Sequence, residues 1–368
     1  MKKLFYFAAV AVALAACAKN EVIPVNSGEN QEITFNVAPK TKADPEPKKE
    51  AFSTDNVFAS WAYYLPKDNT WDANSAAAKE YISDATIAYR EKTTGSTEKV
   101  WKANQPYYWP KDGGRLTFFA YSLNKNDLTL AGEHSKFTCL PNNGITGHID
   151  LNENSNTDFL VAEIAKDKAG NVETHFTNGV PTLFKHRLSS VAFAIKTGAN
   201  YADKAFKLTG ITIHNLSHYG TYGQLPTESF FASGTKYDPV FTSTPQDITY
   251  QTGFVGVTGV DKYIFIPQTF LKGSDDTKNA YIEVKYTITT TVSVTTPEGI
   301  STKEVVEEVT KNIFLYPATG TPMFEKWEMG KKYTINLTFT LDEILWDPAV
   351  QDWEGVNIGA GTKPIIAG

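Results

Sequence analysis

Two histidines have a spacing that could bind a metal ion. His214 and His218 lie four positions apart, which on a helix would place two imidazoles on one face for zinc. The residues between them are predicted to lie at the end of a strand, and the sequence has no evident third ligand. We therefore expect no zinc site.

A second polar stretch alternates like the oxygen ligands at the start of a calcium-binding loop: Asp150, Asn152, Asn154, Asn156 and Asp158. The EF-hand requires glycine and glutamate at two later positions, where this sequence has Ser155 and Val161. A polar loop is therefore the favoured interpretation.

Nucleophilic catalysis has little support either. Cys139 has no evident activating neighbour, and no Ser, His and Asp set has a supporting context. We expect a protein that is not an enzyme and that uses no cofactor or metal.

The N-terminus has the pattern of an export signal. Lys2 and Lys3 precede an apolar run, residues 4–13, that is too short to span a bilayer as a permanent helix. The run ends in Leu-Ala-Ala-Cys, which resembles the bacterial lipobox, so we expect a signal peptide at 1–16 and lipidation of Cys17. Two acyl chains would give stable membrane attachment. The alternative is an ordinary signal peptide with a spare cysteine.

Composition narrows the class of protein. The chain has 368 residues, a net charge of -6 and a pI near 5.6, which argues against a nucleic-acid partner. It has only two cysteines, so with Cys17 lipidated no disulfide holds the fold. Aromatic residues make up 13% of the chain, and no long helical periodicity is present, which indicates β structure. The length predicts two domains.

The first apolar alternation follows a polar tether at 17–31. Ile33, Phe35 and Val37 alternate with polar residues, which predicts a strand with one buried face. The segment 39–50 is rich in lysine and proline and includes Lys40 and Lys42. We expect an exposed loop that a protease can reach.

Short strands are predicted along the rest of the chain. A polar insertion with Trp71 and a short helix near Ala76 follows the strand that ends at Leu65. A long hairpin is expected from Ile282 to Leu315, with its turn at Pro297-Glu298-Gly299 and a solvated polar face. The other predicted strands are at 61–65, 116–121, 158–162, 191–195, 211–213, 263–266 and 333–341. Many short antiparallel strands without helical crossovers predict β-sandwiches.

Five motifs and the lipobox together resemble the fimbrillin family, the type V pilins of Bacteroidales. The motifs are Trp109-Pro110 followed by residues 116–121, Phe184-Lys185-His186-Arg187-Leu188, Ile266-Pro267-Gln268, Gly330-Lys331-Lys332-Tyr333 and Val350-Gln351-Asp352-Trp353. The resemblance implies an all-β fold of two tandem transthyretin-like Greek-key sandwiches. It places an N-terminal domain at 32–180, a C-terminal domain at 181–346 and a tail at 347–368.

The resemblance also implies an assembly mechanism. In these pilins a protease cuts after the first strand, which leaves, and a strand from another subunit fills the groove. Ile33, Phe35 and Val37 would form the displaced strand, and Lys42 or Lys40 would be the cut site. The family usually has arginine there, so Lys42 would need a protease that accepts lysine. An uncut basic loop is the alternative.

The implied role is a structural or adhesive subunit of a cell-surface fimbria on the outer membrane. Its partners would be other fimbrial subunits and the membrane itself, with a host or bacterial surface ligand left open. Whether the tail donates a strand also stays open, because its alternation is weak. The rival is a surface glycan-binding lipoprotein with these platform aromatics: Trp61, Trp71, Trp101, Tyr107, Tyr108 and Trp109.

Overall fold

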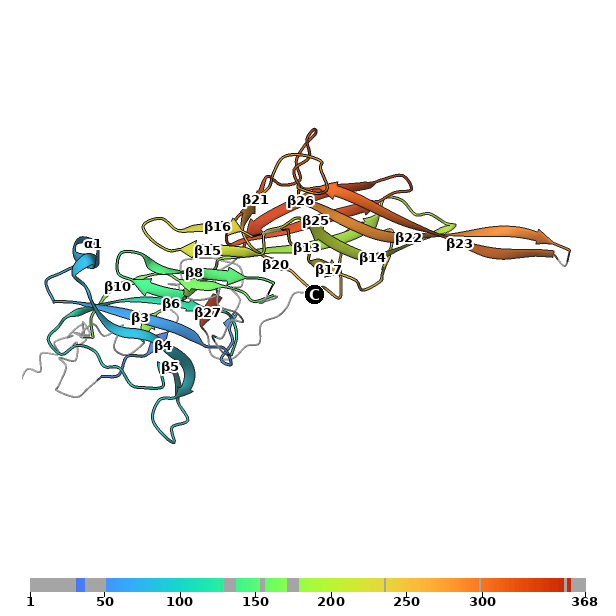
Figure 1. Cartoon of the computed structure of the whole chain (residues 1–368). Helices are drawn as coiled ribbons and strands as arrows, with labels where there is room; N and C mark the ends of the chain where they lie inside the picture. The colour runs from blue at the N-terminus through green and yellow to red at the C-terminus, as the bar shows by residue number, and fades with distance from the viewer. Residues whose placement is uncertain are drawn as a thin grey trace, which may run out of the picture.

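The computed structural model describes residues 31–36, 51–126, 128, 137–152, 156–170, 179–234, 236–297, 299–353 and 356–358. These residues form an all-β protein in which α1 (Trp71–Asn74) and the adjoining 3-10 turn (Ser75–Ala77) are the helical elements described. No helix in the described ranges is long and apolar enough to cross a membrane. The molecule is elongated, with β22 and β23 projecting at one end (Figure 1).

The first half of the chain forms a large curled sheet, here called the N-terminal sheet. Its strands follow the order β11 (Val180–Pro181), β1 (Phe35–Asn36), β5 (Lys99–Ala103), β4 (Lys79–Glu91), β3 (Phe58–Leu65), β6 (Arg115–Ser122), β9 (Leu160–Ala162), β12 (Leu183–His186), β27 (Val356–Ile358) and β2 (Ala51–Phe52), and β10 (Ala165–Lys168) pairs with β6. Phe52 of the last strand contacts Trp101 of β5, with ring centroids 5.5 Å apart. The sheet therefore curls around its own apolar interior.

A four-stranded sheet packs on the other face of the N-terminal sheet. It has the order β16 (Ser229–Ser233), β15 (Tyr219–Gly223), β8 (Gly144–Asp150) and β7 (Phe137–Leu140). Trp61, Phe119 and Phe159 of the first half pack there with Tyr222 of β15 and Ile264. Segments from both halves of the chain thus share one hydrophobic cluster.

The remaining strands form a second sandwich. One sheet, the β13 sheet, contains β19 (Val255–Gly256), β13 (Ser189–Thr197), β25 (Lys331–Phe339) and β26 (Ile344–Asp352), with β20 (Ile264–Phe265) beside β13. The other, the β22 sheet, contains β17 (Val240–Thr242), β14 (Lys204–His214), β22 (Tyr281–Thr296) and β23 (Gly299–Phe314), with β18 (Gln246–Ile248) beside β14. A two-stranded ribbon joins β21 (Gln268–Thr269) to β24 (Lys326–Trp327).

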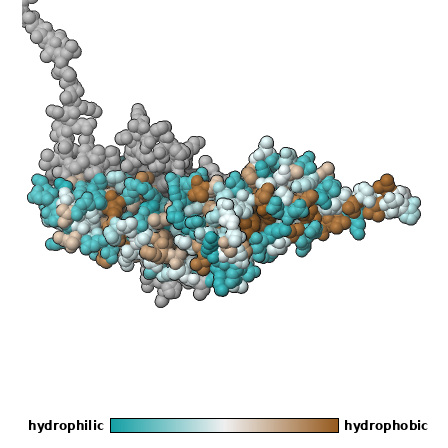
Figure 2. Space-filling view, turned by 90° about the horizontal axis from the view of Figure 1, so that it is seen from above, coloured by the Kyte–Doolittle hydropathy of each residue, from teal (hydrophilic) through white to brown (hydrophobic). Residues whose placement is uncertain are grey.

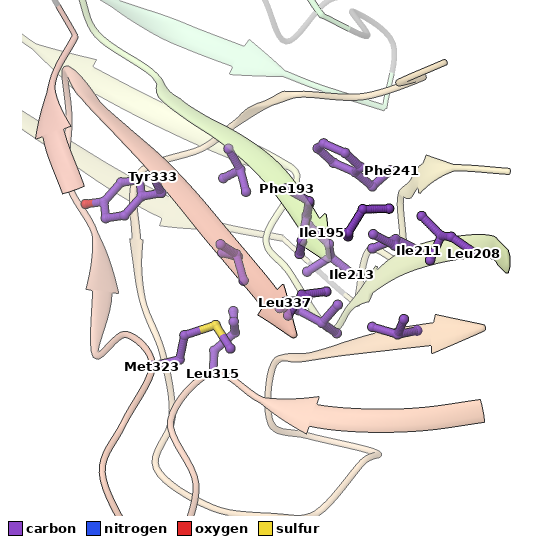
Figure 3. Close-up of a cluster of buried hydrophobic side chains, with 14 of the residues drawn as sticks. Phe193, Ile195, Leu208, Ile211, Ile213, Phe241, Leu315, Met323, Tyr333 and Leu337 are labelled. Carbon is purple, nitrogen blue, oxygen red and sulfur yellow. The ribbon is translucent and has the colours of Figure 1, made fainter. Parts of the chain in front are cut away.

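The core of this sandwich follows from alternation along its strands. Phe193 and Ile195 of β13 face Ile211 and Ile213 of β14, and Leu337 of β25 joins them (Figure 3). Each is at most 2% exposed. Because successive side chains point to opposite faces of a strand, alternate apolar residues give each sheet one buried face.

Most of the predicted strands are present in the structure, including the long hairpin of β22 and β23. The polar insertion after Leu65 differs from the prediction, because it contains β4 and β5 as well as the short helix. In β4 only Ile82, Ala85 and Ile87 are buried, and Asp84 has a positive φ of 44° that interrupts the alternation. A period of two is therefore not visible in its sequence.

The two-domain division with a boundary near residue 180 stays a prediction. Strand pairing gives two observations about the segments on either side of the predicted boundaries. Residues 347–352, expected in the tail, belong to β26 and pair with β25. The hairpin of β15 and β16 follows residue 181 in the chain but pairs with β8.

Candidate assembly site

The first described strand lies in a slot between two other segments. On one side, the Ile33 amide donates to the Tyr107 carbonyl at 2.7 Å, and the Trp109 amide donates to the Gln31 carbonyl at 2.9 Å. Phe35 also pairs with Trp101 of β5. This side of the slot is therefore an antiparallel pairing.

On the other side, β1 pairs in parallel with β11. The Val180 amide donates to the Thr34 carbonyl at 2.7 Å, and the Thr182 amide donates to the Asn36 carbonyl at 2.8 Å. The strand is thus flanked on both edges rather than forming the edge of the sheet.

The side chains of this segment alternate as predicted. Ile33 is 3% exposed and Phe35 is 4% exposed, whereas Thr34 and Asn36 are half-buried on the other face. The Phe35 ring makes edge-to-face contacts with Phe58 and Phe118, with centroids 5.4 and 5.8 Å apart. The strand therefore completes the apolar interior of the curled sheet.

Gly179 permits the close approach of β1 to β11. Its φ is +81°, and a Cβ built there would lie 2.9 Å from the carbonyl carbon of Phe35 and 2.9 Å from the Thr34 oxygen. Only glycine avoids both the backbone strain and this contact. The alternation of apolar residues does not single out Gly179, and the Gly-Val-Pro sequence before β12 is the signal that could have identified it.

An ion pair closes one end of the slot. Lys102 Nζ lies 3.0 Å from Glu32 Oε2, and both side chains are more than three-quarters buried. A partly buried pair of this kind fixes the register of β1 beside β5 more than it stabilises the fold.

The free-energy terms for residues 31–36, the segment that contains β1, nearly balance. Burying Ile33 and Phe35 stabilises by about 3–6 kcal/mol, from about 1.5–3 for each side chain. The backbone hydrogen bonds named above add about 2–6 kcal/mol in total. Ordering residues 31–36 costs about 6–12 kcal/mol. A segment that was cut from the rest of the chain would therefore have little net affinity for the slot.

The C-terminal segment forms the strand next to the far end of the same sheet. Val356–Ile358 (β27) pairs antiparallel with β12 and parallel with β2. Just before it, the Trp353 ring stacks on His186 with centroids 3.9 Å apart and planes 8° apart. His186 Nδ1 is 2.7 Å from Asp158 Oδ2 in a buried pair. Both ends of the described chain therefore pack against one sheet.

Several predicted site residues fall outside the part of the chain that the structure describes. These are the lipidation residue Cys17, the candidate cut sites Lys40 and Lys42, and Val37 of the predicted strand. Of that strand, Ile33 and Phe35 occupy the slot.

The residues with metal-binding spacing are engaged in other contacts. His218 Nδ1 is 2.9 Å from Asp150 Oδ1, whereas His214 stacks on Tyr281. Asp158, at the other end of the calcium-like stretch, pairs with His186. Among the described residues, no group of three His, Cys, Asp or Glu side chains could hold a metal ion.

Cys139 is a buried free cysteine. Burial is the main reason that the pKa of its thiol is raised above its ordinary value, so the thiolate is disfavoured. A nucleophilic role for this residue has no support in its surroundings.

The aromatic residues weighed as a glycan platform are mostly in the interior. Four tryptophans are at most 4% exposed: Trp61, Trp71, Trp101 and Trp109. Tyr108 is 38% exposed, and Tyr107 is partly buried against the curled sheet. Buried rings cannot stack on a sugar, so these tryptophans serve packing.

Comparison with known proteins gives the family. The family model described as fimbrillin-like matches residues 63–353. The chain belongs to the fimbrillin-like family. No curated protein matches the sequence.

Solved structures of fimbrial and cell adhesion proteins align with this chain, and the first of them shows a related fold. A fimbrial protein from Bacteroides vulgatus aligns with a TM-score of 0.58 and 16% identity, over 88% of this chain and 100% of that one. A proposed cell adhesion protein from Bacteroides uniformis aligns with a TM-score of 0.47 and 16% identity, over 89% and 99%. The tip fimbrial protein from Porphyromonas gingivalis gives 0.36 and 11%, over 88% and 100%.

Membership of the family indicates a structural role at the cell surface rather than a catalytic one. The candidate assembly site is the slot that holds β1, because it is lined by backbone groups on both edges and filled by two apolar side chains of one short segment.

Proposed function

We propose that this chain is a structural or adhesive subunit of a cell-surface fimbria, assembled by strand exchange. Cleavage after Lys42 or Lys40 would free the segment that carries Ile33 and Phe35. A strand from another subunit would then take its place between β5 and β11. The observation that carries this proposal is the placement of residues 31–36, which are flanked on both edges and have Ile33 and Phe35 buried.

The near-balance of free energies supports the exchange. While β1 is covalently attached, its high effective concentration keeps it in the slot. Once it is cut, the segment loses that advantage and a longer donor strand with more apolar side chains can displace it. The vacated slot would expose unpaired backbone groups and an apolar trough, which favours rapid occupation by a donor.

The proposal includes export as a lipoprotein through Cys17. The signal-like segment before this cysteine and the polar tether after it support the assignment. Labelling cells with a palmitate analogue should mark the wild-type protein and leave a Cys17→Ser variant unlabelled. Equal labelling of both proteins would contradict lipidation at this residue.

A lysine-specific protease tests the exchange. Treatment of the purified precursor should remove residues up to Lys42 or Lys40 and yield ladders of subunits that survive mild denaturant. A Lys40→Ala, Lys42→Ala double variant is the matched control, and it should stay uncut there and form no ladders. Wild-type protein that is cut after Lys42 but keeps its first strand and forms no ladders would refute the exchange.

A further inference from the structure

The hairpin of β22 and β23 extends past the body of the protein as a two-stranded arm (Figure 1). Pairing between β14 and β22 ends at Lys204 and Thr290, and one further bond joins the Thr291 amide to the Asp203 carbonyl at 2.9 Å. Beyond that point the two strands pair only with each other among the described residues. The described residues beyond that point, 292–297 and 299–303, are here called the arm, and its five β22 residues from Val292 to Thr296 span about 17 Å at about 3.4 Å per residue.

The two strands of the hairpin differ in charge. On the arm β23 has one charged residue, Lys303, and Glu304, Glu307, Glu308 and Lys311 follow along the same strand beside the body. Charged side chains of this kind protect an edge strand from pairing with another chain. In contrast, β22 has no charged residue from Val292 to Thr296, and its outer edge there has no partner among the described strands.

The backbone groups on this uncharged edge can be assigned. The Thr291 amide points toward β14, because it donates to Asp203. Alternate residues of a strand direct their N–H and C=O groups to the same side, so Ser293 and Thr295 also point outward. Val292 and Val294 direct theirs toward β23. The free edge therefore presents two N–H and C=O pairs for another strand.

Apolar side chains accompany this edge. Val292 and Val294 continue the face that is buried at Ile288, but on the arm they are 36% and 38% exposed. Val305, opposite Thr290 on the same face, is 49% exposed. Figure 2 shows hydrophobic residues along the projecting arm. An isolated two-stranded hairpin is only marginally stable, and further strands would stabilise it.

We propose that two copies of this chain join through this edge, residues 292–296, in antiparallel register about a two-fold axis at Val294. The segment is complementary to itself in this register: Val294 meets its own copy, and Ser293 meets Thr295 of the partner subunit. About four backbone hydrogen bonds form, and no like charges oppose each other across the junction.

The geometry of the chain supports a second copy as the occupant. The strand that the second copy adds ends at its Pro297, which has no amide N–H to donate. That end lies beside the part of β22 where pairing with β14 begins. The added strand thus covers the part of the β22 edge that β14 does not cover. The two arms together form a four-stranded sheet with a β23 strand on each outer edge. The contact needs no cleavage of the chain, so it is independent of the strand exchange proposed above.

Sedimentation of the purified, uncut protein over a range of concentrations tests the proposal. We expect a weak monomer–dimer equilibrium, because the contact is small. Val294→Lys places two like charges at the two-fold axis and should weaken the dimer at least about tenfold. Ile300→Lys, on β23 and 80% exposed, is the matched control and should leave it unchanged. Monomers at every concentration, or open-ended oligomers, would overturn the proposal.

Cross-linking and amide exchange give independent readouts. Directly opposed residues of a non-hydrogen-bonded antiparallel pair lie about 4.5 Å apart at Cα, which permits a disulfide. Val294→Cys should therefore form a covalent dimer on oxidation, whereas Ile300→Cys should not. The Ser293 and Thr295 amides should become protected as concentration rises, while Val292 is protected throughout. Equal cross-linking of the two variants, or no change in protection, would refute the arrangement.

Discussion

Replacing Phe35 with alanine is the sharpest test of the role of β1 in the uncut protein. The ring is 4% exposed and lies edge-to-face against Phe58 and Phe118. Truncation of a buried phenylalanine costs about 3–5 kcal/mol. Because β1 lies next to the end of the sheet, neighbouring groups can partly collapse into the space, and we expect the lower end, about 3 kcal/mol.

Urea unfolding, followed through tryptophan fluorescence, measures this change. Trp101 packs in the same cluster as Phe35 and is 4% exposed, so it reports on this part of the fold. A loss of about 3 kcal/mol should lower the unfolding midpoint by about 1–3 M urea. The variant should also release residues 31–36 to a protease more readily than the wild type does.

The matched control is Thr34→Ala in the same strand. Its side chain is half-buried, and its carbonyl still accepts the hydrogen bond from Val180. It should lose less than about 1 kcal/mol. If Phe35→Ala lost no more stability than Thr34→Ala, the strand would not be part of the core, and the reasoning about a removable strand would fail.

Three further substitutions test other parts of the structure. Gly179→Ala should destabilise the protein by more than about 1 kcal/mol in urea unfolding. The control is Gly95→Ala: Gly95 has a φ of +80° and nothing within 4 Å of an added Cβ, so the variant has backbone strain without a steric clash and should lose less stability. Equal losses of stability in the two variants would contradict the close approach of β1. Burial lowers the pKa of Lys262 to about 8, so the native state loses this proton before the unfolded chain does, and stability rises with pH between about 8 and 10.5. Relative to Lys262→Met, the wild type should therefore gain about 1–2 kcal/mol of unfolding free energy from pH 7.5 to 9.5. A difference in unfolding free energy that stays constant over this pH range would contradict the lowered pKa of Lys262. Trp353→Ala removes the ring stacked on His186 and should cost about 1–2 kcal/mol, with faster proteolysis after residue 353; unchanged proteolysis would show that this stacking does not hold the C-terminal segment.

Clear alternation made several strands predictable. In β25, Tyr333, Ile335 and Leu337 are buried and the residues between them are half-buried, as the sequence indicates. The same holds for Ile33 and Phe35 of the first strand. A strand with one buried face carries this information locally, because side-chain direction alternates whatever the strand pairs with.

Strands with irregular or weak patterns could not be predicted. In β4 the register shifts where it pairs with β3, and the positive φ of Asp84 lies within it. Buried positions there lie three and then two positions apart, as Ile82, Ala85 and Ile87 show. A bulge changes which face a side chain occupies, so the alternation is lost from the sequence while the strand persists.

The sequence by itself determined the all-β class, the apolar faces of the regularly alternating strands, the long hairpin and the resemblance to fimbrillins, because these depend on side-chain type and local spacing. Only the tertiary structure decided the partners of each strand. It places β1 between β5 and β11, returns β27 to the N-terminal sheet, and leaves the β22 edge of the arm unpaired beyond β14. Backbone hydrogen bonds are the same for every residue type, so partners distant in the chain are selected by packing of the whole fold.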